Sequence, residues 1–190
     1  MASRLSIANE CTTCSPSITL PKPAPKILEH MAAHVLFDTN IERIDEPCGL
    51  CLRPSPHCVF YLKRGKGAGT SDQVDFTKSK CTNKVHFSYA IASLSTPSSP
   101  CSNVPLRCPI CPASEPCVWR YNLLYHMRAK HPAISLTLYE SLWQITGTET
   151  YLIKETWLNR HKQKKTRKSR NDKTSSLIVS EAHSSRLALR

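Results

Sequence analysis

Cysteine and histidine pairs recur through the first 131 residues of this chain at spacings that suit metal ligands. A C-x2-C turn brings two thiolates to one ion, and two histidines four or five residues apart project from one side of a short helix. Four such ligands, thiolates among them, favour structural Zn²⁺ and leave no open position for catalysis. Two groups contain a full set: Cys11, Cys14, His30 and His34, and Cys108, Cys111, His126 and His131.

A third C-x2-C turn, at residues 48–51, needs two further ligands from the middle of the chain. Cysteines are the first candidates, and Cys58 and His86 are alternatives for the fourth position. A cluster of reduced cysteines that serve only as small apolar residues is the competing interpretation. With this site the chain is expected to bind up to three structural Zn²⁺ ions and to depend on them for folding. The preferred ligands are Cys48, Cys51, Cys81 and Cys101.

The composition favours a metal-organised chain over one built on a large aliphatic core. Fourteen prolines, only four phenylalanines and short apolar runs indicate small units that need a staple. Residues 1–10 contain no apolar signal segment and no stretch approaches 18 apolar residues, so we expect a soluble, intracellular protein with reduced thiols and no membrane partner. A secreted disulfide scaffold would leave the paired histidines unexplained. Because H-E-x-x-H, nucleophile-elbow and phosphate-loop spacings do not occur in the sequence, we expect no enzyme activity.

Short helices must present the histidines of both complete groups. Pro25 suits a first helical turn, and the segment KILEHMAAHVLF places Ile27 on the same side as the two histidines. In the last group, VWRYNLLYHMRAKH is compatible with a helix that Pro132 ends, and Leu123 lies three residues before His126. Both groups resemble Cys-Cys-His-His zinc fingers. The first lacks the aromatic residue of the family's loop, and the second has 14 residues between its pairs where about 12 are usual.

A wider resemblance rests on three segments, HVLFDTNIERIDEPCGLCLRP, SPCSNVPLRCPIC and VWRYNLLYHMRAKHP. They look like parts of an uncharacterised fungal zinc-finger group, over about residues 25–135. The resemblance implies metal sites and no established activity. Since 73 residues separate His34 from Cys108, far more than the linker of a tandem finger array, we expect one composite module.

The other segments predict a small metal-stabilised α+β fold with short strands in its middle. CVFYLK, VDFTKSKC and KVHFSYAIAS are typical of strands, and GKGAG of a flexible basic hairpin tip. Residues 133–160 have helical period on both sides of Gly147, with Thr146 and Glu149 as a capping box, and predict a helical hairpin that packs on the last finger. The expected divisions are a disordered N-terminus (1–10), a first zinc finger (11–37), a middle cysteine-rich β region (38–107), a C-terminal zinc finger (108–132), the helical hairpin (133–160) and a basic, largely disordered tail (161–190).

Positive charge is concentrated near the C-terminus. Of the 26 Lys and Arg residues 11 lie in residues 151–190, with only 3 of the 14 Asp and Glu, and the whole chain has a net charge of +12. A dense cationic run without an apolar stripe is typical of a nuclear-localisation or nucleic-acid segment that contacts phosphates. The residues predicted to make these contacts are Arg160, Lys162, Lys164, Lys165, Arg167, Lys168, Arg170 and Lys173.

Base reading by the fingers has weaker support. If the register of the zinc-finger family is transferred with His126 as the seventh helical residue, Trp119, Asn122 and Tyr125 take the reading positions. Only Asn122 has the chemistry to pair with adenine.

We therefore predict a nuclear zinc-finger module that contacts DNA or chromatin mainly through its basic tail, in keeping with transcription regulation. One alternative is a protein-interaction adaptor that uses the helices near Trp143 and Trp157. The other is an RNA-binding protein in which Trp119, Tyr121 and Tyr125 stack on unpaired bases.

Overall fold

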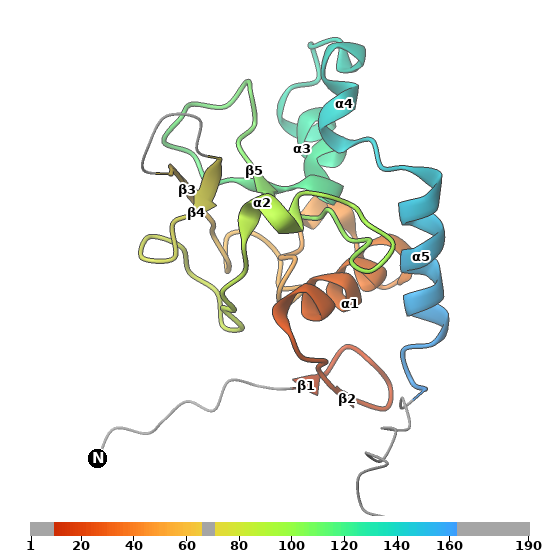
Figure 1. Cartoon of the computed structure of the whole chain (residues 1–190). Coiled ribbons are helices and arrows are strands. Elements are labelled where there is room, and N and C mark those ends of the chain that lie inside the picture. The colour runs from red at the N-terminus through yellow and green to blue at the C-terminus, as the bar shows by residue number, and fades with distance from the viewer. Residues whose placement is uncertain (1–9, 66–70, 163–190) are drawn as a thin grey trace, which may run out of the picture.

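A computed structural model describes residues 10–65 and 71–162 (Figure 1). The predictions for residues 1–9, for the hairpin tip at 66–70 and for the tail from residue 163 lie outside the described residues. Short strands and helices give the small mixed α/β structure expected from the sequence. In order they are β1 (Glu10–Cys11), β2 (Ile18–Thr19), α1 (Ala24–Phe37), the 3₁₀ helix η1 (Arg43–Asp45), β3 (Leu62–Arg64), β4 (Asp72–Val74), α2 (Tyr89–Ala92), β5 (Pro105–Leu106), β6 (Val118–Trp119), the 3₁₀ helix η2 (Arg120–Asn122), α3 (Leu123–Lys130), the 3₁₀ helix η3 (Leu136–Tyr139), α4 (Glu140–Trp143) and α5 (Gly147–Leu158).

The strands form three separate antiparallel ribbons, β1–β2, β3–β4 and β5–β6. Two-stranded ribbons of this size are marginal in water by themselves, so they depend on the packing around them. Two isolated bridges extend the pairing: Val59 opposite Lys80, and Phe60 opposite Cys117. The second bridge joins the middle region to the segment that leads into β6.

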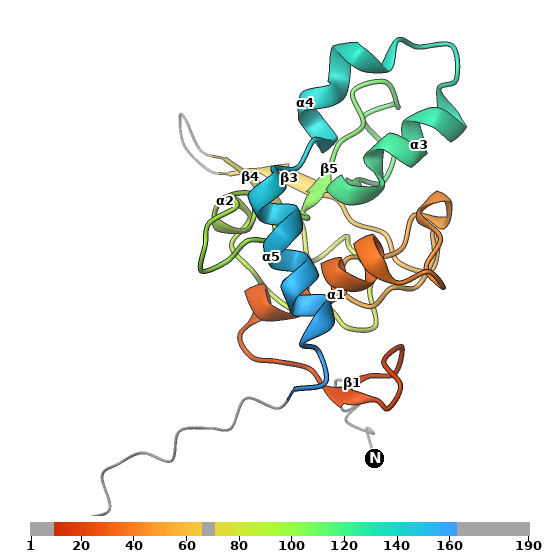
Figure 2. The same ribbon diagram turned by 90° about the vertical axis from the view of Figure 1, so that its right-hand side faces the viewer.

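Helix α1 lies inside the molecule. Pro25 occupies its first turn, as predicted, and every residue from Ile27 to Val35 is buried. A helix that is buried on all sides serves as a core element. Helix α5 packs along α1, as both views show (Figures 1 and 2).

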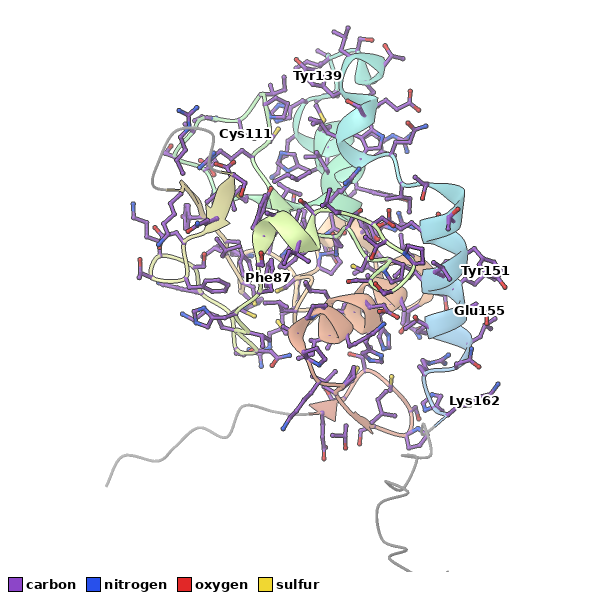
Figure 3. The ribbon with its side chains drawn as sticks, viewed as in Figure 1. Phe87, Cys111, Tyr139, Tyr151, Glu155 and Lys162 are labelled. Carbon is purple, nitrogen blue, oxygen red and sulfur yellow. The ribbon has the colours of Figure 1, made fainter. Side chains whose placement is uncertain are left out.

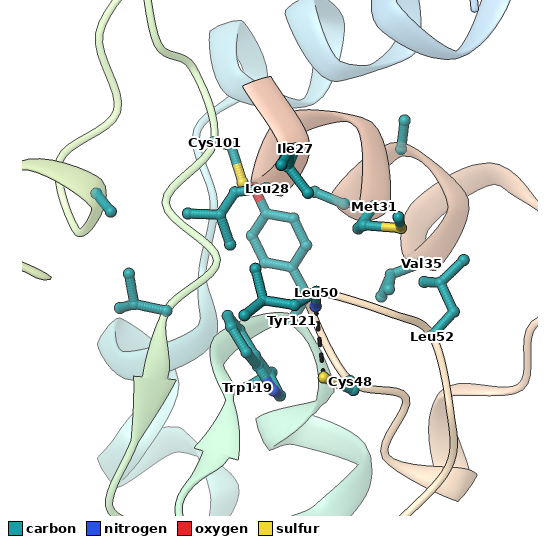
Figure 4. Close-up of a cluster of buried hydrophobic side chains, with 14 of the residues drawn as sticks. Ile27, Leu28, Met31, Val35, Cys48, Leu50, Leu52, Cys101, Trp119 and Tyr121 are labelled. Atoms are coloured by element: carbon teal, nitrogen blue, oxygen red, sulfur yellow. Dashed lines mark hydrogen bonds between the residues drawn. The ribbon is translucent and has the colours of Figure 1, made fainter. Parts of the chain in front are cut away.

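One main core joins segments from the whole described chain. It contains residues of α1, Leu50 within and Leu52 just after the middle C-x2-C turn, Trp119 and Tyr121 of the last finger, and Ile153 of α5. Figure 4 shows Tyr121 extending through this cluster, with Cys101 at its hydroxyl end. A smaller core of Cys108, Val118, Leu123 and Met127 lies under the last finger and is covered by residues of η3 and α4.

The prediction that both helices of residues 133–160 pack on the last finger is wrong for the second helix. Helix α4 does cover the last finger, but α5 leaves it and packs on α1, because Ile153 is fully buried in the main core. Of the two hydrogen bonds of the expected capping box at the start of α5, one is present: the Thr146 hydroxyl accepts the backbone N–H of Glu149 at 3.1 Å. The Glu149 carboxylate instead accepts hydrogen bonds from the backbone N–H of Ser102 at 2.8 Å and from the Tyr121 hydroxyl at 2.5 Å.

The strand predictions for the middle region hold only in part. The segments CVFYLK and VDFTKSKC contribute to β3, β4 and the bridge between Val59 and Lys80. The third segment, KVHFSYAIAS, contains no strand and instead ends in the short helix α2. Its apolar residues there follow a helical turn, with Ala92 buried.

Candidate metal centres

The first centre is fully buried between the β1–β2 ribbon and α1. The Cys14 Sγ lies 3.2 Å from the His34 Nε2 and 3.7 Å from the His30 Nε2, and the Cys11 Sγ lies 3.5 Å from the His34 Nε2. All four ligand atoms lie within 4.8 Å of one another. A tetrahedral Zn²⁺ with Zn–S bonds of about 2.3 Å and Zn–N bonds of about 2.0 Å separates its ligands by roughly 3.3–3.8 Å. The residues therefore fit one ion.

The surroundings of the first centre shift the pKa values of its thiols and fix the tautomer of His34. Burial raises the pKa of the Cys14 thiol to about 12, whereas in Cys11 burial is outweighed by hydrogen bonds to His30 and His34, which lower the thiol pKa to about 5. The other ring nitrogen of His34, Nδ1, donates to the Asp38 carboxylate at 2.8 Å. That bond fixes the tautomer in which Nε2 is free to bind a metal.

The middle centre contains four cysteines. The Sγ of Cys51 lies 3.3 Å from that of Cys58 and 3.7 Å from that of Cys81, and the Sγ of Cys48 lies 3.7 Å from that of Cys81. The C-G-L-C turn presents its thiols through the backbone: the N–H groups of Cys51 and Leu52 donate to the Cys48 carbonyl, and Leu52 takes a positive φ of 61°. The N–H of Leu50 also points at the Cys48 Sγ, at 3.4 Å (Figure 4).

The fourth ligand of this centre is Cys58, and the prediction of Cys101 is wrong. Cys101 is only 3% exposed, but it lies in the main core, away from the other thiols. Cys58 reaches the site because the bridge between Val59 and Lys80 places it directly beside Cys81. The alternative His86 is exposed and stacks on Phe76 instead.

Hydrogen bonds among the thiols favour a negative charge at the middle centre. Bonds from Cys48 and Cys58 lower the pKa of Cys51, whereas burial raises the pKa of Cys48. Four sulfur ligands that favour a negative charge suit a soft divalent ion.

The last centre repeats the first, with 14 residues in place of 15 between its two pairs and one more residue between its histidines. The Cys111 Sγ lies 3.3 Å from the His126 Nε2 and 3.2 Å from the His131 Nε2, and the Cys108 Sγ lies 3.5 Å from the His131 Nε2. The β5–β6 ribbon and α3 position these ligands. Cys117 takes no part in the cluster, and its backbone N–H donates to the Phe60 carbonyl at 2.7 Å.

A carboxylate from the middle region supports the last centre. The Nδ1 of His126 donates to the Glu46 Oε1 at 2.6 Å, although the two residues are 80 positions apart. Glu46 has a φ of 51°, a left-handed conformation that is costly for a non-glycine residue and tends to persist where the surroundings demand it. It lies two residues before Cys48, so one short segment serves two centres.

Further contacts join the same two centres. The Asn122 amide donates to the Pro47 carbonyl at 2.8 Å. A Cβ added to Gly49 would lie 2.4 Å from the Trp119 ring, so only glycine permits this approach. The middle and last centres are therefore parts of one packed unit.

The residues predicted to read bases are used for packing. Asn122 is 0% exposed and its amide is committed to Pro47, so the expected adenine contact is wrong. Trp119 and Tyr121 are buried in the main core, which rules out the predicted stacking on unpaired bases. Tyr125 is half-buried, with the Arg43 guanidinium 5.1 Å from its ring centre. The spacing of the finger motif could not reveal this, because the core that covers these residues comes from other segments.

Two residues of the predicted basic run belong to the described part of the chain. The Arg160 guanidinium lies 3.6 Å from the ring centre of Trp157 and donates to its carbonyl, while Lys162 is exposed. Trp157 in turn packs on the ring of His34, at 5.1 Å between centroids. The other predicted contacts lie outside the described residues: Lys164, Lys165, Arg167, Lys168, Arg170 and Lys173.

Comparisons of this chain with protein-family models, with curated proteins and with solved structures found no significant match. The likeness to fungal zinc-finger proteins therefore stays a prediction from motifs, whereas the three Cys/His clusters stand on their own geometry. None of the helices in the described ranges is long and apolar enough to cross a membrane.

Proposed function

We propose that this chain is a nuclear, zinc-stabilised module that binds nucleic acid mainly through the basic run that begins at Arg160, with DNA or chromatin as its main target and transcription regulation as its setting. The observation that carries the proposal is the burial of α1 and of two of the three base-reading positions of the last finger, Trp119 and Asn122. Residues Ile27–Val35 of α1 lie in the core, and the reading position Asn122 has no exposed surface. The three centres thus serve as scaffold, and the charge of the chain provides the contact.

The basic run suits phosphate contact in position and in chemistry. It begins just after α5 ends at Leu158, and Figure 3 shows Glu155 of α5 and Lys162 at the edge of the molecule. Lysine and arginine on such a segment release counterions from nucleic acid, and this gives affinity with little sequence information. The expected signature is a steep dependence of affinity on salt.

The test compares the zinc-loaded full chain with a variant that neutralises four cations, K164Q/K165Q/R167Q/K168Q. Duplex binding is measured by fluorescence anisotropy between about 50 and 200 mM salt. Removing one phosphate contact reduces the slope of log K against log salt by about 0.9, so the slope of the variant should be smaller by up to about 3.6. The matched control neutralises four exposed cations elsewhere, Lys22, Arg128, Lys130 and Lys154, and should change the slope less. Equal slopes for the two variants, or no binding by the parent chain, would contradict the proposal.

A protein-interaction adaptor is the second candidate, and one observation favours it. Tyr151 and Leu158 are 62% and 59% exposed, and they lie seven residues apart on the same side of α5. Figure 3 shows Tyr151 pointing away from the molecule. The expected face around Trp143 and Trp157 is less suitable, since both rings are half-buried against the protein itself. Failure of the parent chain to bind DNA or RNA at low salt would favour this candidate.

A further inference from the structure

A surface cleft in the middle region, apart from the basic run, combines aromatic rings with positive charge. It has a volume of about 400 Å³ and lies between the β3–β4 ribbon and the segment that enters α2. Phe76, His86, Phe87 and Tyr89 line it, and Figure 3 places Phe87 beside α2. Phe76, Phe87 and Tyr89 pack against the main core, whereas His86 is exposed and is not a member of the middle metal centre.

The rings form a series of aromatic contacts from the core to the surface, edge-to-face between Phe76 and Phe87 and tilted in the other two pairs. Phe87 lies 6.5 Å from the buried ring of Trp119 and 6.0 Å from Phe76, measured between centroids. The ring of His86, which is exposed, lies 4.1 Å from that of Phe76 at an interplanar angle of 40°. The inner rings are therefore fixed by packing, and the outer ring offers a π-face to solvent.

The charges around the cleft favour an anionic ligand. Lys63 lines the cleft and is exposed. The next residue in the chain, Arg64, is also exposed. The Lys84 ammonium lies 2.8 Å from the carbonyl oxygen of Phe76. The nearby acids are already engaged: Asp72 pairs with Arg107 at 3.1 Å, and Asp75 is buried and accepts from the hydroxyl and N–H of Thr77.

We propose that this cleft binds an unpaired base of single-stranded nucleic acid, stacked on the exposed ring of His86, which Phe76 supports from behind, with Lys63 contacting an adjacent phosphate. Stacking accepts any base and cations follow the backbone, which is how single strands are bound without sequence readout. A base in a duplex is paired and covered on both faces, so it cannot enter the cleft. The inference rests on the proposed nucleic-acid function and adds a preference for unpaired strands.

The decisive variant is His86→Ala, measured on the zinc-loaded full chain with oligo(U), oligo(dT) and a duplex, each of about 12 nucleotides or base pairs. Loss of one stacking ring should weaken single-strand binding by about 5-fold to 100-fold and leave duplex binding unchanged. His86→Phe keeps a ring and should retain the affinity of the parent chain. His57→Ala, which removes another exposed histidine outside the cleft, is the matched control and should have no effect.

The same measurements separate the two proposals. Unchanged single-strand affinity in His86→Ala, or equal losses in His86→Ala and His86→Phe, would overturn the stacking site, while the salt dependence of the basic-run variant would still decide the wider function. A loss on oligo(U) alone would identify RNA as the ligand, and equal losses on both strands would identify any unpaired strand. Lys63→Gln should lower the salt slope for single strands by about 0.7, and an unchanged slope would remove Lys63 from the site.

Discussion

The most direct prediction concerns Glu46, which links the middle and last centres. Its Oε1 accepts the Nδ1–H of His126 at 2.6 Å, and the two side chains are only 20% and 8% exposed, so solvent screens the contact poorly. Glu46→Gln keeps the length and an acceptor oxygen but removes the negative charge that makes the imidazole a stronger ligand. Loss of such an outer-sphere partner typically costs 10-fold to 100-fold in metal affinity, or about 1.4–2.7 kcal/mol.

The assay is the release of zinc to a chelator, with the number of ions retained followed by native mass spectrometry. The substitution should accelerate the loss of one ion and leave the other two as in the parent chain. Asp38→Asn should do the same at the first centre, where Asp38 holds His34. Glu42→Gln changes an exposed acid four residues before Glu46 and is the matched control. If Glu46→Gln released no ion faster than Glu42→Gln does, Glu46 would not support the last centre.

Three further predictions address the middle centre, the packing and the pH dependence. Native mass spectrometry should find one zinc fewer in Cys58→Ser than in the parent chain, whereas Cys101→Ser should retain the full number; the reverse result would restore Cys101 as a ligand. Gly49→Ala should lower the free energy of unfolding by about 1–3 kcal/mol in urea titrations, because its Cβ would meet the ring of Trp119 at 2.4 Å, and an unchanged midpoint would contradict that contact. The pKa of the Cys11 thiol in the folded chain is about 5, below its ordinary 9.0, so its thiolate stabilises the fold fully above pH 9 and loses that contribution as the pH falls toward 5. Because this thiolate is protonated as the pH falls through about 5, zinc release should increase on acidification through that pH, and release that is independent of pH would refute the assignment of thiolate ligands.

The sequence predicts the ligands where the spacing is local and fails where tertiary pairing decides. Each Cys-Cys-His-His set lies within 24 residues, and one turn plus one helix is enough to bring it together. The middle set needs a partner across the chain, and two cysteines were equally available. The choice of Cys58 follows from the pairing of Val59 with Lys80, which no spacing rule contains. The packing of α5 on α1 could not be predicted from the sequence for the same reason, because it joins residues more than 100 positions apart.

The burial of α1 and of the base-reading positions Trp119 and Asn122 also changes where a partner can bind. In a free finger the helix positions before the first histidine face outward, but here Trp119, Tyr121 and Asn122 are covered by the middle region and α5. Those contacts pack the middle and last centres against each other through the segment that contains Glu46 and Pro47. The nucleic-acid contact that we propose must then use exposed side chains. The aromatic and basic side chains of the middle region and the cationic run that begins at Arg160 are the main candidates, and of α3 the exposed residues are Arg128, Ala129 and Lys130.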